Sequence, residues 1–269
     1  MIIPRAQLFE FNDRSETPVA LRDAIVEALG RAMAWGRMLE PLVPYLRRFL
    51  DEAGSHQILD LCAGAGEPAC ILAGELARAN VEGATITLTD LYPRIEAWEA
   101  ARSRHPAIID FVPDSVDASR MPDALATGRV RTVINAFHHF PEPLAIAILK
   151  NAVASSRGIF VSEPFDRHPR LLLPFLPFGL AALAAGPVLT ERDRLAKAFY
   201  TWLTPAALVA GAWDGFVSTL RIYREEDIRR MIAPFGDAFR WEFGTYEYWP
   251  GGRGLWFYGV PRSPKANGA

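Results

Sequence analysis

The stretch ILDLCAGAGEPA, from Ile58 to Ala69, decides the fold of this 269-residue chain. An apolar run leads into Gly64-Ala65-Gly66, and a helical pattern over Ala69–Ala79 follows. Gly64 to Ala69 fits G-x-G-x-x-G/A, a strand-to-helix turn whose glycines let a ligand approach the backbone. The pattern suits several nucleotide cofactors, so it predicts cofactor binding without saying which cofactor binds.

Asp60 lies four residues before the first glycine, at the end of the predicted buried strand. A carboxylate there would be desolvated and would repel a pyrophosphate, whereas it would attract a cation. S-Adenosylmethionine carries a sulfonium and an ammonium group, and a carboxylate can reach the ammonium directly or through water. We therefore predict S-adenosylmethionine as the cofactor. The alternative is that Asp60 only caps the turn.

Short β-rich runs alternate with helical patterns around this loop, which indicates parallel strands joined by crossover helices. Two helices are predicted between Val19 and Phe49, and an amphipathic helix is predicted over Arg224–Phe235, before a Pro-Gly-Gly turn at Pro250–Gly252. The predicted strands are His56–Leu61, Ala84–Thr89, Ile108–Val112, Val130–Ala136, Gly158–Ser162, and two more near Arg240–Tyr248 and Gly254–Val260.

Acidic residues also follow the second and third predicted strands. Asp90 stands where this type of fold presents a carboxylate to the ribose hydroxyls, although it could instead cap the helix predicted after Pro93. Asp117 could accept the exocyclic amine of adenine while the amide of Ala118 meets a ring nitrogen. The three acids thus fit three parts of one nucleoside cofactor.

These elements resemble the successive motifs of class I S-adenosylmethionine-dependent methyltransferases, over about residues 55–164. The resemblance implies that Asp60 contacts the methionine moiety, Asp90 the ribose and Asp117 the adenine. One departure is Cys62-Ala63, where a Gly-Cys pair is common, so that an extra Cβ borders the cofactor. The predicted cofactor contacts are Asp60, Cys62, Gly64, Gly66, Asp90, Leu91, Asp117, Ala118 and Asn135.

A wider resemblance covers most of the chain. The motifs LFEF, DLCAGAGEP, AFHHF and WDGFVSTLRIY are similar to those of a group of uncharacterised bacterial methyltransferase-like proteins. This second resemblance names no substrate.

Candidate reactive groups follow the fourth and fifth strands, because ligands bind at the carboxyl ends of parallel strands. His138, His139 and Glu163 are the predicted catalytic residues, and one histidine could act as a general base. The alternative is that the His-His pair only shapes the pocket. We predict no metal, because adjacent histidines project differently and no H-x-x-x-H or C-x-x-C motif supports a site.

A polar and aromatic cluster ends an apolar insertion in the α/β pattern. Trp213, Asp214, Arg221 and Tyr223 suit a substrate pocket with an aromatic wall and paired charges. The alternative is that Asp214 and Arg221 pair to anchor this segment to the sheet. Both interpretations stay open at the level of sequence.

Two uncharged stretches, Leu171–Thr190 and Ala198–Trp213, interrupt the α/β pattern. Three prolines and two glycines make Leu171–Thr190 a poor single membrane span. We interpret the insertion as a helical lid over an apolar substrate, and the rival interpretation is a surface-lying hairpin that contacts anionic lipid through residues 171–213.

Composition bears on which partners and which cellular compartment we expect for this protein. The net charge of −2, without a dense basic tract, argues against nucleic acid as a partner. Two closely spaced cysteines and an N-terminus without a signal-peptide pattern favour a cytoplasmic protein, with membrane association as the open alternative. The oligomeric state cannot be predicted.

We therefore predict a Rossmann-like α/β protein with a seven-stranded, mainly parallel sheet, whose last strand is antiparallel as the resemblance implies. The predicted function is methyl transfer from S-adenosylmethionine to an apolar or aromatic small molecule. Alternatives are transfer of another group from this cofactor, a membrane-associated cofactor-binding protein, and an NAD- or FAD-dependent oxidoreductase. The predicted parts are N-terminal helices (1–54), cofactor core (55–164), apolar lid (165–223) and the C-terminal helix with two strands (224–261).

Overall fold

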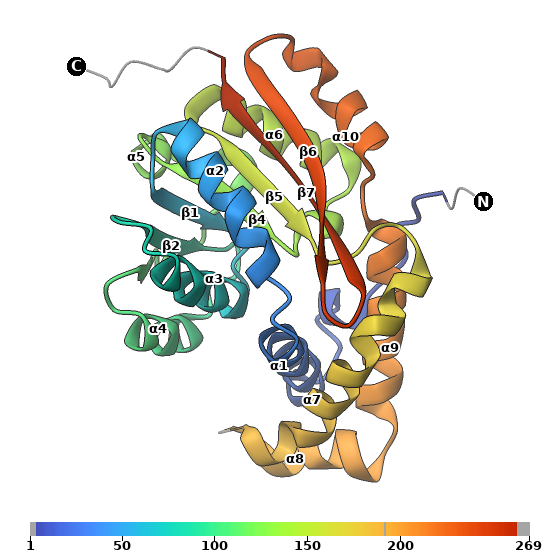
Figure 1. The fold of residues 1–269 in the computed structure, drawn as a ribbon. Coiled ribbons are helices and arrows are strands. Elements are labelled where there is room, and N and C mark those ends of the chain that lie inside the picture. Colours follow the sequence, from blue (N-terminus) through green and yellow to red (C-terminus); the bar gives the residue numbers. More distant parts are fainter. Residues whose placement is uncertain (1–3, 191, 263–269) are drawn as a thin grey trace. The chain divides into compact units, whose positions relative to one another are not determined.

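The computed structural model describes residues 4–190 and 192–262 of the chain (Figure 1). They divide into two compact units, each built from separated segments. The helical unit comprises residues 1–38, 165–222 and 247–253, and the sheet unit comprises residues 39–164, 223–246 and 254–269. Each unit is described below by itself.

The sheet unit contains a seven-stranded sheet in the order β3-β2-β1-β4-β5-β7-β6. Strands β1 to β5 pair in parallel, and β7 pairs with β5 in the antiparallel direction. This confirms the predicted Rossmann-like class. The strands are β1 (Gln57–Leu61), β2 (Thr85–Thr89), β3 (Ile109–Phe111), β4 (Val130–Ile134), β5 (Ile159–Glu163), β6 (Phe239–Tyr248) and β7 (Gly252–Pro261).

The predicted fourth strand ends earlier than the sequence suggested. Its last residue is Ile134, and Asn135 adopts a left-handed backbone with φ of 57°. Because a strand needs extended backbone, this conformation stops β4 before Ala136. The turn between β6 and β7 contains Pro250, whose bond to Trp249 is cis.

Helices cover both faces of the sheet. On one face, α6 and α10 bury aliphatic side chains against β1, β4, β5 and β7. On the other face, Phe49 of α2 lies against Phe160 and Tyr258. The helices of this unit are α2 (Val43–Ala53), α3 (Glu67–Arg78), α4 (Ile95–Arg104), α5 (Asp123–Ala126), α6 (Glu142–Ser155) and α10 (Glu225–Ile232), with 3-10 turns η2 (Glu40–Leu42), η3 (Ala118–Arg120), η4 (Phe137–His139) and η7 (Ala233–Phe235).

The helical unit packs through small side chains. Ala28 and Ala32 of α1 contact Ala182 of α7, while Leu21 and Ile25 contact the start of α9. Small residues let helix axes approach closely, which explains how so many alanines form a core. The elements are η1 (Phe11–Asp13), α1 (Val19–Trp35), η5 (Pro169–Phe175), α7 (Leu176–Leu189), α8 (Arg194–Ala198), the π-helical turn η6 (Phe199–Leu203) and α9 (Ala206–Arg221).

One helical stretch in the described part of the chain, Leu172–Leu189, is long and apolar enough to cross a membrane by length and composition. Its mean hydropathy is 1.9, and only 17% of it is buried. Pro174 and Pro177 accompany the change from η5 to α7, and Pro187 lies inside α7.

Candidate cofactor and catalytic site

The loop between β1 and α3 has left-handed backbone at Cys62, Gly64 and Gly66, with φ of 59°, 55° and 83°. A Cβ at Gly66 would come within 3.2 Å of Leu88 and 3.4 Å of Trp98, so packing as well as backbone conformation selects glycine there. A Cβ at Gly64 would meet no atom within 4 Å, so Gly64 is required by its φ alone. The left-handed Cys62 is strained, and such strain clusters at ligand sites.

Asp60 is buried in the middle of the sheet, 4% exposed, between β2 and β4. Its Oδ1 accepts a hydrogen bond of 2.6 Å from the hydroxyl of Thr132. Burial raises the pKa of Asp60 to about 7; the Thr132 hydrogen bond opposes this rise, and the charge of Asp90 adds to it. No cation pairs with Asp60 among residues 4–190 and 192–262. An isolated buried carboxylate of this kind is costly, and a cationic ligand would lower the cost.

Asp90, directly after β2, binds the backbone of the glycine loop through its side chain. Its Oδ2 accepts the amide of Gly64 at 2.9 Å, and its Oδ1 accepts the amide of Tyr92 at 2.9 Å. The side chain therefore organises the loop and its own turn. It does not cap α4, which begins at Ile95 after Arg94. Leu91, the neighbouring predicted contact, is 48% exposed.

Two residues of this site were missed by sequence reasoning. The indole of Trp98 donates to the carbonyl of Gly64 at 2.9 Å, and the ring is fully buried beneath the loop. Thr132 supplies the side-chain partner of Asp60. A tryptophan within a helical pattern carries no local signal for this role. The one polar, non-charged residue in the buried strand VRTVI could have drawn attention to Thr132.

Several acidic side chains lie close enough to the loop between β1 and α3 to affect the pKa of Cys62. Burial raises the pKa of the Cys62 thiol, and the charges of Asp90, Asp60 and Asp117 raise it further. The carboxyl groups of Asp60 in β1, Asp90 after β2 and Asp117 at the start of η3 thus all act on the Cys62 thiol. Such a field favours a cation and disfavours a phosphate or a thiolate.

Asp117 and Ala118 lie at the start of η3. Asp117 Oδ1 accepts the amide of Ser119 at 2.8 Å and the Ser119 hydroxyl at 2.7 Å, and these bonds hold the pKa of Asp117 below its usual value. Ala118 is buried. The pair sits on an ordered turn rather than on a loose loop. Its predicted contact with adenine stays a prediction.

The ends of β4 and β5 bring together His138 and Glu163. Glu163 Oε1 accepts the amide of His138 at 2.8 Å, and its Oε2 lies 2.7 Å from His138 Nδ1. Both side chains are buried, and the ring of His139 lies 4.2 Å from that of His138, centroid to centroid. A carboxylate can only accept, so Nδ1 carries the hydrogen and neutral His138 has its lone pair on Nε2. Glu163 therefore fixes the orientation of the His138 ring.

The predicted substrate residues divide between the two units. In the helical unit, Asp214 accepts the amides of Phe11 and Asn12 at 2.7 and 3.1 Å, and the Trp213 indole donates to Phe9 O. In the sheet unit, the hydroxyl of Tyr223 donates to the carbonyl of Phe140, next to η4. Each of these polar groups thus has a partner within its own unit.

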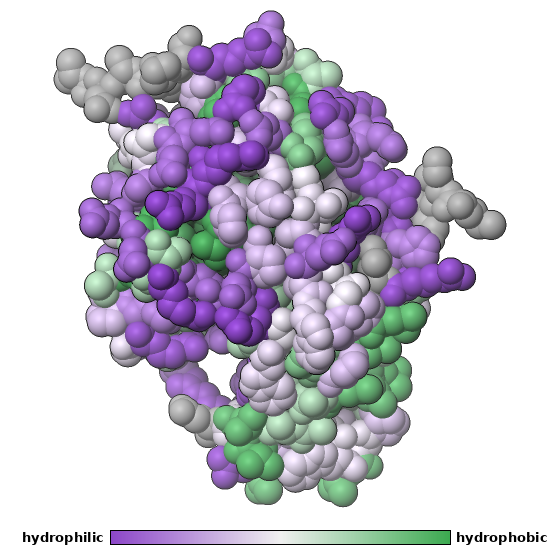
Figure 2. Space-filling model, viewed as in Figure 1, coloured by the Kyte–Doolittle hydropathy of each residue, from purple (hydrophilic) through white to green (hydrophobic). Residues whose placement is uncertain are grey.

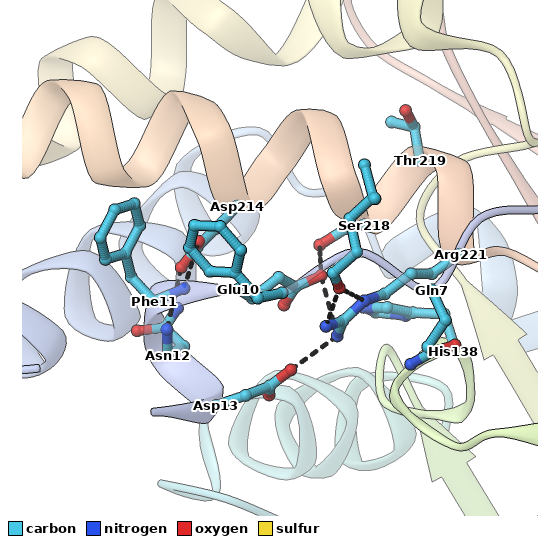
Figure 3. Close-up of polar contacts among 12 residues, drawn as sticks. Gln7, Glu10, Phe11, Asn12, Asp13, His138, Asp214, Ser218, Thr219 and Arg221 are labelled. Atoms are coloured by element: carbon cyan, nitrogen blue, oxygen red, sulfur yellow. Dashed lines mark hydrogen bonds and ion pairs between the residues drawn. The ribbon is translucent and has the colours of Figure 1, made fainter. Parts of the chain in front are cut away.

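Arg221 holds the same N-terminal segment (Figure 3). Its guanidinium donates to the carbonyl of Leu8 and lies 3.2 Å from a carboxylate oxygen of Glu10 and 2.7 Å from one of Asp13. Ser218, one helical turn earlier, donates to Glu10. We call residues 6–13 the N-terminal strap, because α9 fastens it with charged and polar side chains.

The fold is that of class I methyltransferases. A putative O-methyltransferase from Nostoc punctiforme PCC 73102 is similar to the chain with a TM-score of 0.52 and 16% identity, over 96% of this chain and 64% of that one. Magnesium protoporphyrin IX methyltransferase from Synechocystis PCC 6803, solved with bound SAH, gives a TM-score of 0.48 and 15% identity, over 83% of each chain. No family model matches the sequence, and the search of curated proteins found no match.

Proposed function

We propose that this protein transfers a methyl group from S-adenosylmethionine to a small-molecule acceptor of apolar or aromatic character. The observation that carries the proposal is Asp60, a buried carboxyl group with no cationic partner in the described residues, beside a glycine loop of left-handed backbone. A cationic nucleoside is the ligand whose charge suits this site.

The residues of the sheet unit fit the cofactor part by part. Asp60 would hold the methionine ammonium, Asp90 the ribose, and Asp117 with Ala118 the adenine. The open space above Gly64 admits ligand atoms against the backbone, and the acidic field around Cys62 argues against a pyrophosphate. The nicotinamide and flavin alternatives are therefore the weaker ones.

We assign to His138 the removal of the acceptor's proton, and to Glu163 the orientation of His138. The cofactor, when bound, supplies an activated methyl group on a good leaving group, so the protein has to align the acceptor and remove its proton. Glu163 fixes the ring of His138 through Nδ1, which leaves Nε2 as the atom that would take a proton. A phenol or enol is an acceptor whose acidity suits such a base. His139 then lines the site beside it.

The apolar character of the acceptor is inferred from the helical unit. Its segment from Ala198 to Trp213 has no charged residue, and its core is built from alanine and leucine. That this unit serves as a lid stays a prediction.

Calorimetric titration with S-adenosylmethionine and S-adenosylhomocysteine tests the cofactor. We expect binding by the wild-type chain and at least about tenfold weaker binding of S-adenosylmethionine by Asp60→Asn, because one charge-assisted contact is lost. Asp110→Asn is the matched control, since Asp110 is an exposed acid on β3. Absent binding, or equal binding by both variants, would refute the proposal.

Labelled methyl transfer to phenol and quinol acceptors tests the reaction. We expect Glu163→Gln to lower kcat by about 10²-fold or more while it leaves S-adenosylmethionine binding unchanged, because it removes the orientation of the base. Transfer of label from the aminopropyl part, and not from the methyl group, would instead support the alternative group-transfer enzyme. Binding of NAD or FAD in place of S-adenosylmethionine would support the oxidoreductase.

A further inference from the structure

The turn that carries His138 and His139 is too short to be stable on its own. Turn η4 spans three residues, and two backbone hydrogen bonds of 3.2 Å close it, from His139 N to Ala136 O and from Phe140 N to Phe137 O. A single turn of 3-10 helix fixes several backbone angles for few hydrogen bonds. The direction of the His138 ring therefore depends on contacts that come from other elements.

Contacts on two sides hold the start and the middle of this turn. Phe137 lies in the hydrophobic core of the sheet unit, where its ring meets that of Phe257 edge-on. Glu163 accepts the amide of His138 at 2.8 Å and lies beside Nδ1 of the same residue. These contacts do not reach the carbonyl of Phe140, which follows the turn.

Tyr223 holds the end of the turn. Its hydroxyl donates to the carbonyl of Phe140 at 2.8 Å, and its ring lies edge-on against that of Phe137 at 5.7 Å, centroid to centroid. Carbonyls at the end of a helical turn have no partner within it, and Tyr223 supplies one. The side chain thus contacts the residues immediately before and after the two histidines. The motifs AFHHF and WDGFVSTLRIY, which end at Phe140 and Tyr223, meet at this hydrogen bond.

The core around Tyr223 does not itself need a hydroxyl group. Tyr223 is 3% exposed and belongs to a cluster of aliphatic and aromatic side chains that includes Ile228 and Met231, in which phenylalanine would pack equally well. Burying a hydroxyl costs free energy unless it forms a hydrogen bond, and here the bond goes to the backbone beside the histidines. Tyrosine in place of phenylalanine therefore serves the turn.

We propose that Tyr223 is a positioning residue, which fixes through the carbonyl of Phe140 the turn that directs His138 at the acceptor. The inference rests on the proposed function, in which the acceptor hydroxyl gives its proton to Nε2 of His138 while its oxygen bonds to the methyl carbon and the carbon–sulfur bond breaks. A misplacement of about 1 Å can cost such a reaction about 10²-fold in rate. The sequence predicted Tyr223 as a substrate residue, whereas this role needs no contact with the substrate.

Labelled methyl transfer by Tyr223→Phe tests the alignment. With an unionised phenol as acceptor we expect kcat to fall about tenfold, while the KM values for both substrates stay within about twofold of the wild type, because neither binding site changes. A phenol that is ionised at the assay pH, such as a nitrophenol, needs no base. With that acceptor the variant and the wild type should have kcat values within about twofold of each other.

Tyr258→Phe is the matched control. The hydroxyl of Tyr258 is buried in the same unit and donates to Glu52 of α2 at 2.9 Å, on the opposite face of the sheet from Phe137. The side chain of Glu52 is 29% exposed, and Figure 2 shows a hydrophilic surface, in purple, where Figure 1 places α2. Water can therefore replace the lost partner. This variant should transfer methyl groups to both acceptors as the wild type does.

Hydrogen exchange of the His138 amide, followed by NMR on the full chain, tests the turn without any reaction. This amide is bonded to Glu163, so it should exchange slowly in the wild type. Tyr223→Phe should speed its exchange at least about tenfold, and Tyr258→Phe should leave it unchanged. The amide of Arg131 in β4, bonded to a carbonyl of the neighbouring strand segment at 2.9 Å, is the internal reference for a general loss of stability.

Four outcomes would overturn the inference. They are unchanged exchange at His138 in Tyr223→Phe, an equal acceleration at Arg131, an equal loss of kcat with both acceptors, and a raised KM for the acceptor with kcat unchanged. The last of these would support substrate contact by Tyr223. A wild-type chain that transfers no methyl group would refute the proposed function, and the exchange of His138 would still decide whether Tyr223 holds the turn.

Discussion

The two units bury charged side chains in opposite ways. In the helical unit, Arg221 lies against Glu10 and Asp13, and Lys197 lies 2.6 Å from Glu27. In the sheet unit, Asp60 is equally buried, but its side-chain partner is the neutral hydroxyl of Thr132. Arg221 and Lys197 thus have opposite charges beside them, whereas the buried carboxyl group of Asp60 has none in the described residues and would be stabilised by a cationic ligand.

This difference also bears on the predicted substrate residues. Asp214 and Arg221 have the partners expected of residues that hold a chain segment in place. Burial raises the pKa of Asp214, and the amide hydrogen bonds from Phe11 and Asn12 oppose that rise. Their proposed role in substrate binding remains a prediction, and stability measurements can distinguish the two roles.

The largest expected effect is on the strap. Arg221→Met should lower the free energy of unfolding by about 3–5 kcal/mol, because it leaves Glu10 buried without its counter-charge. Urea titration measures the loss. The double variant with Glu10→Gln should recover part of it, since the remaining charge is then removed. A double variant as unstable as the sum of the two single variants would contradict this assignment.

The second largest expected effect is a gain in stability, on substitution of Asp60. The pKa of Asp60 rises from 3.8 to about 7 on folding, so the folded chain keeps a proton that the unfolded chain loses. The associated stability is present below pH 3.8 and is lost as the pH rises to 7. Asp60→Asn should therefore stabilise the ligand-free protein by about 2–4 kcal/mol at pH 8, and much less at pH 4.

Urea titrations of wild type and Asp60→Asn at several pH values check this difference, in which other titrating groups cancel. A gain that does not vary with pH would contradict the assignment to the Asp60 proton. Added S-adenosylmethionine should reverse the order at pH 8, because the cation then compensates the wild-type carboxylate.

The smallest effect concerns Lys197. Its partner Glu27 has a side chain that is 35% exposed and can return to water, so Lys197→Met should cost only about 1 kcal/mol. Thermal unfolding measures it. Arg229→Met is the control, because its pair with Glu225 is exposed on both sides and should contribute less still. A loss as large as that of Arg221→Met would mean that exposure of the partner does not set the cost.

The sequence predicted the sheet well because its signals are local. The run around Asp60, the glycine loop and the alternation of strands and helices each depend on neighbouring residues, and the structure confirms the resulting fold class. The end of β4 was predicted two residues too late, although asparagine adopts left-handed backbone more readily than most residues, and Asn135 does so here.

The contacts of the site were harder to predict than its position. Trp98 reaches Gly64 across 34 positions in the chain, and Thr132 reaches Asp60 across 72. Both pairings exist only after helix α4 and strand β4 have packed. The partners of Arg221, 208 positions away at Asp13, were equally hidden. The roles of the site residues therefore remain predictions for the experiments above.

The discontinuity of the helical unit has a consequence for how the chain is made. Its three segments are separated by residues 39–164 and 223–246 of the sheet unit, and the last segment is residues 247–253. The strap is synthesised before α9, so it can be fastened only after Arg221 has been synthesised. During synthesis the strap and α1 must therefore wait for α7 and α9, so we expect the helical unit to complete its folding late.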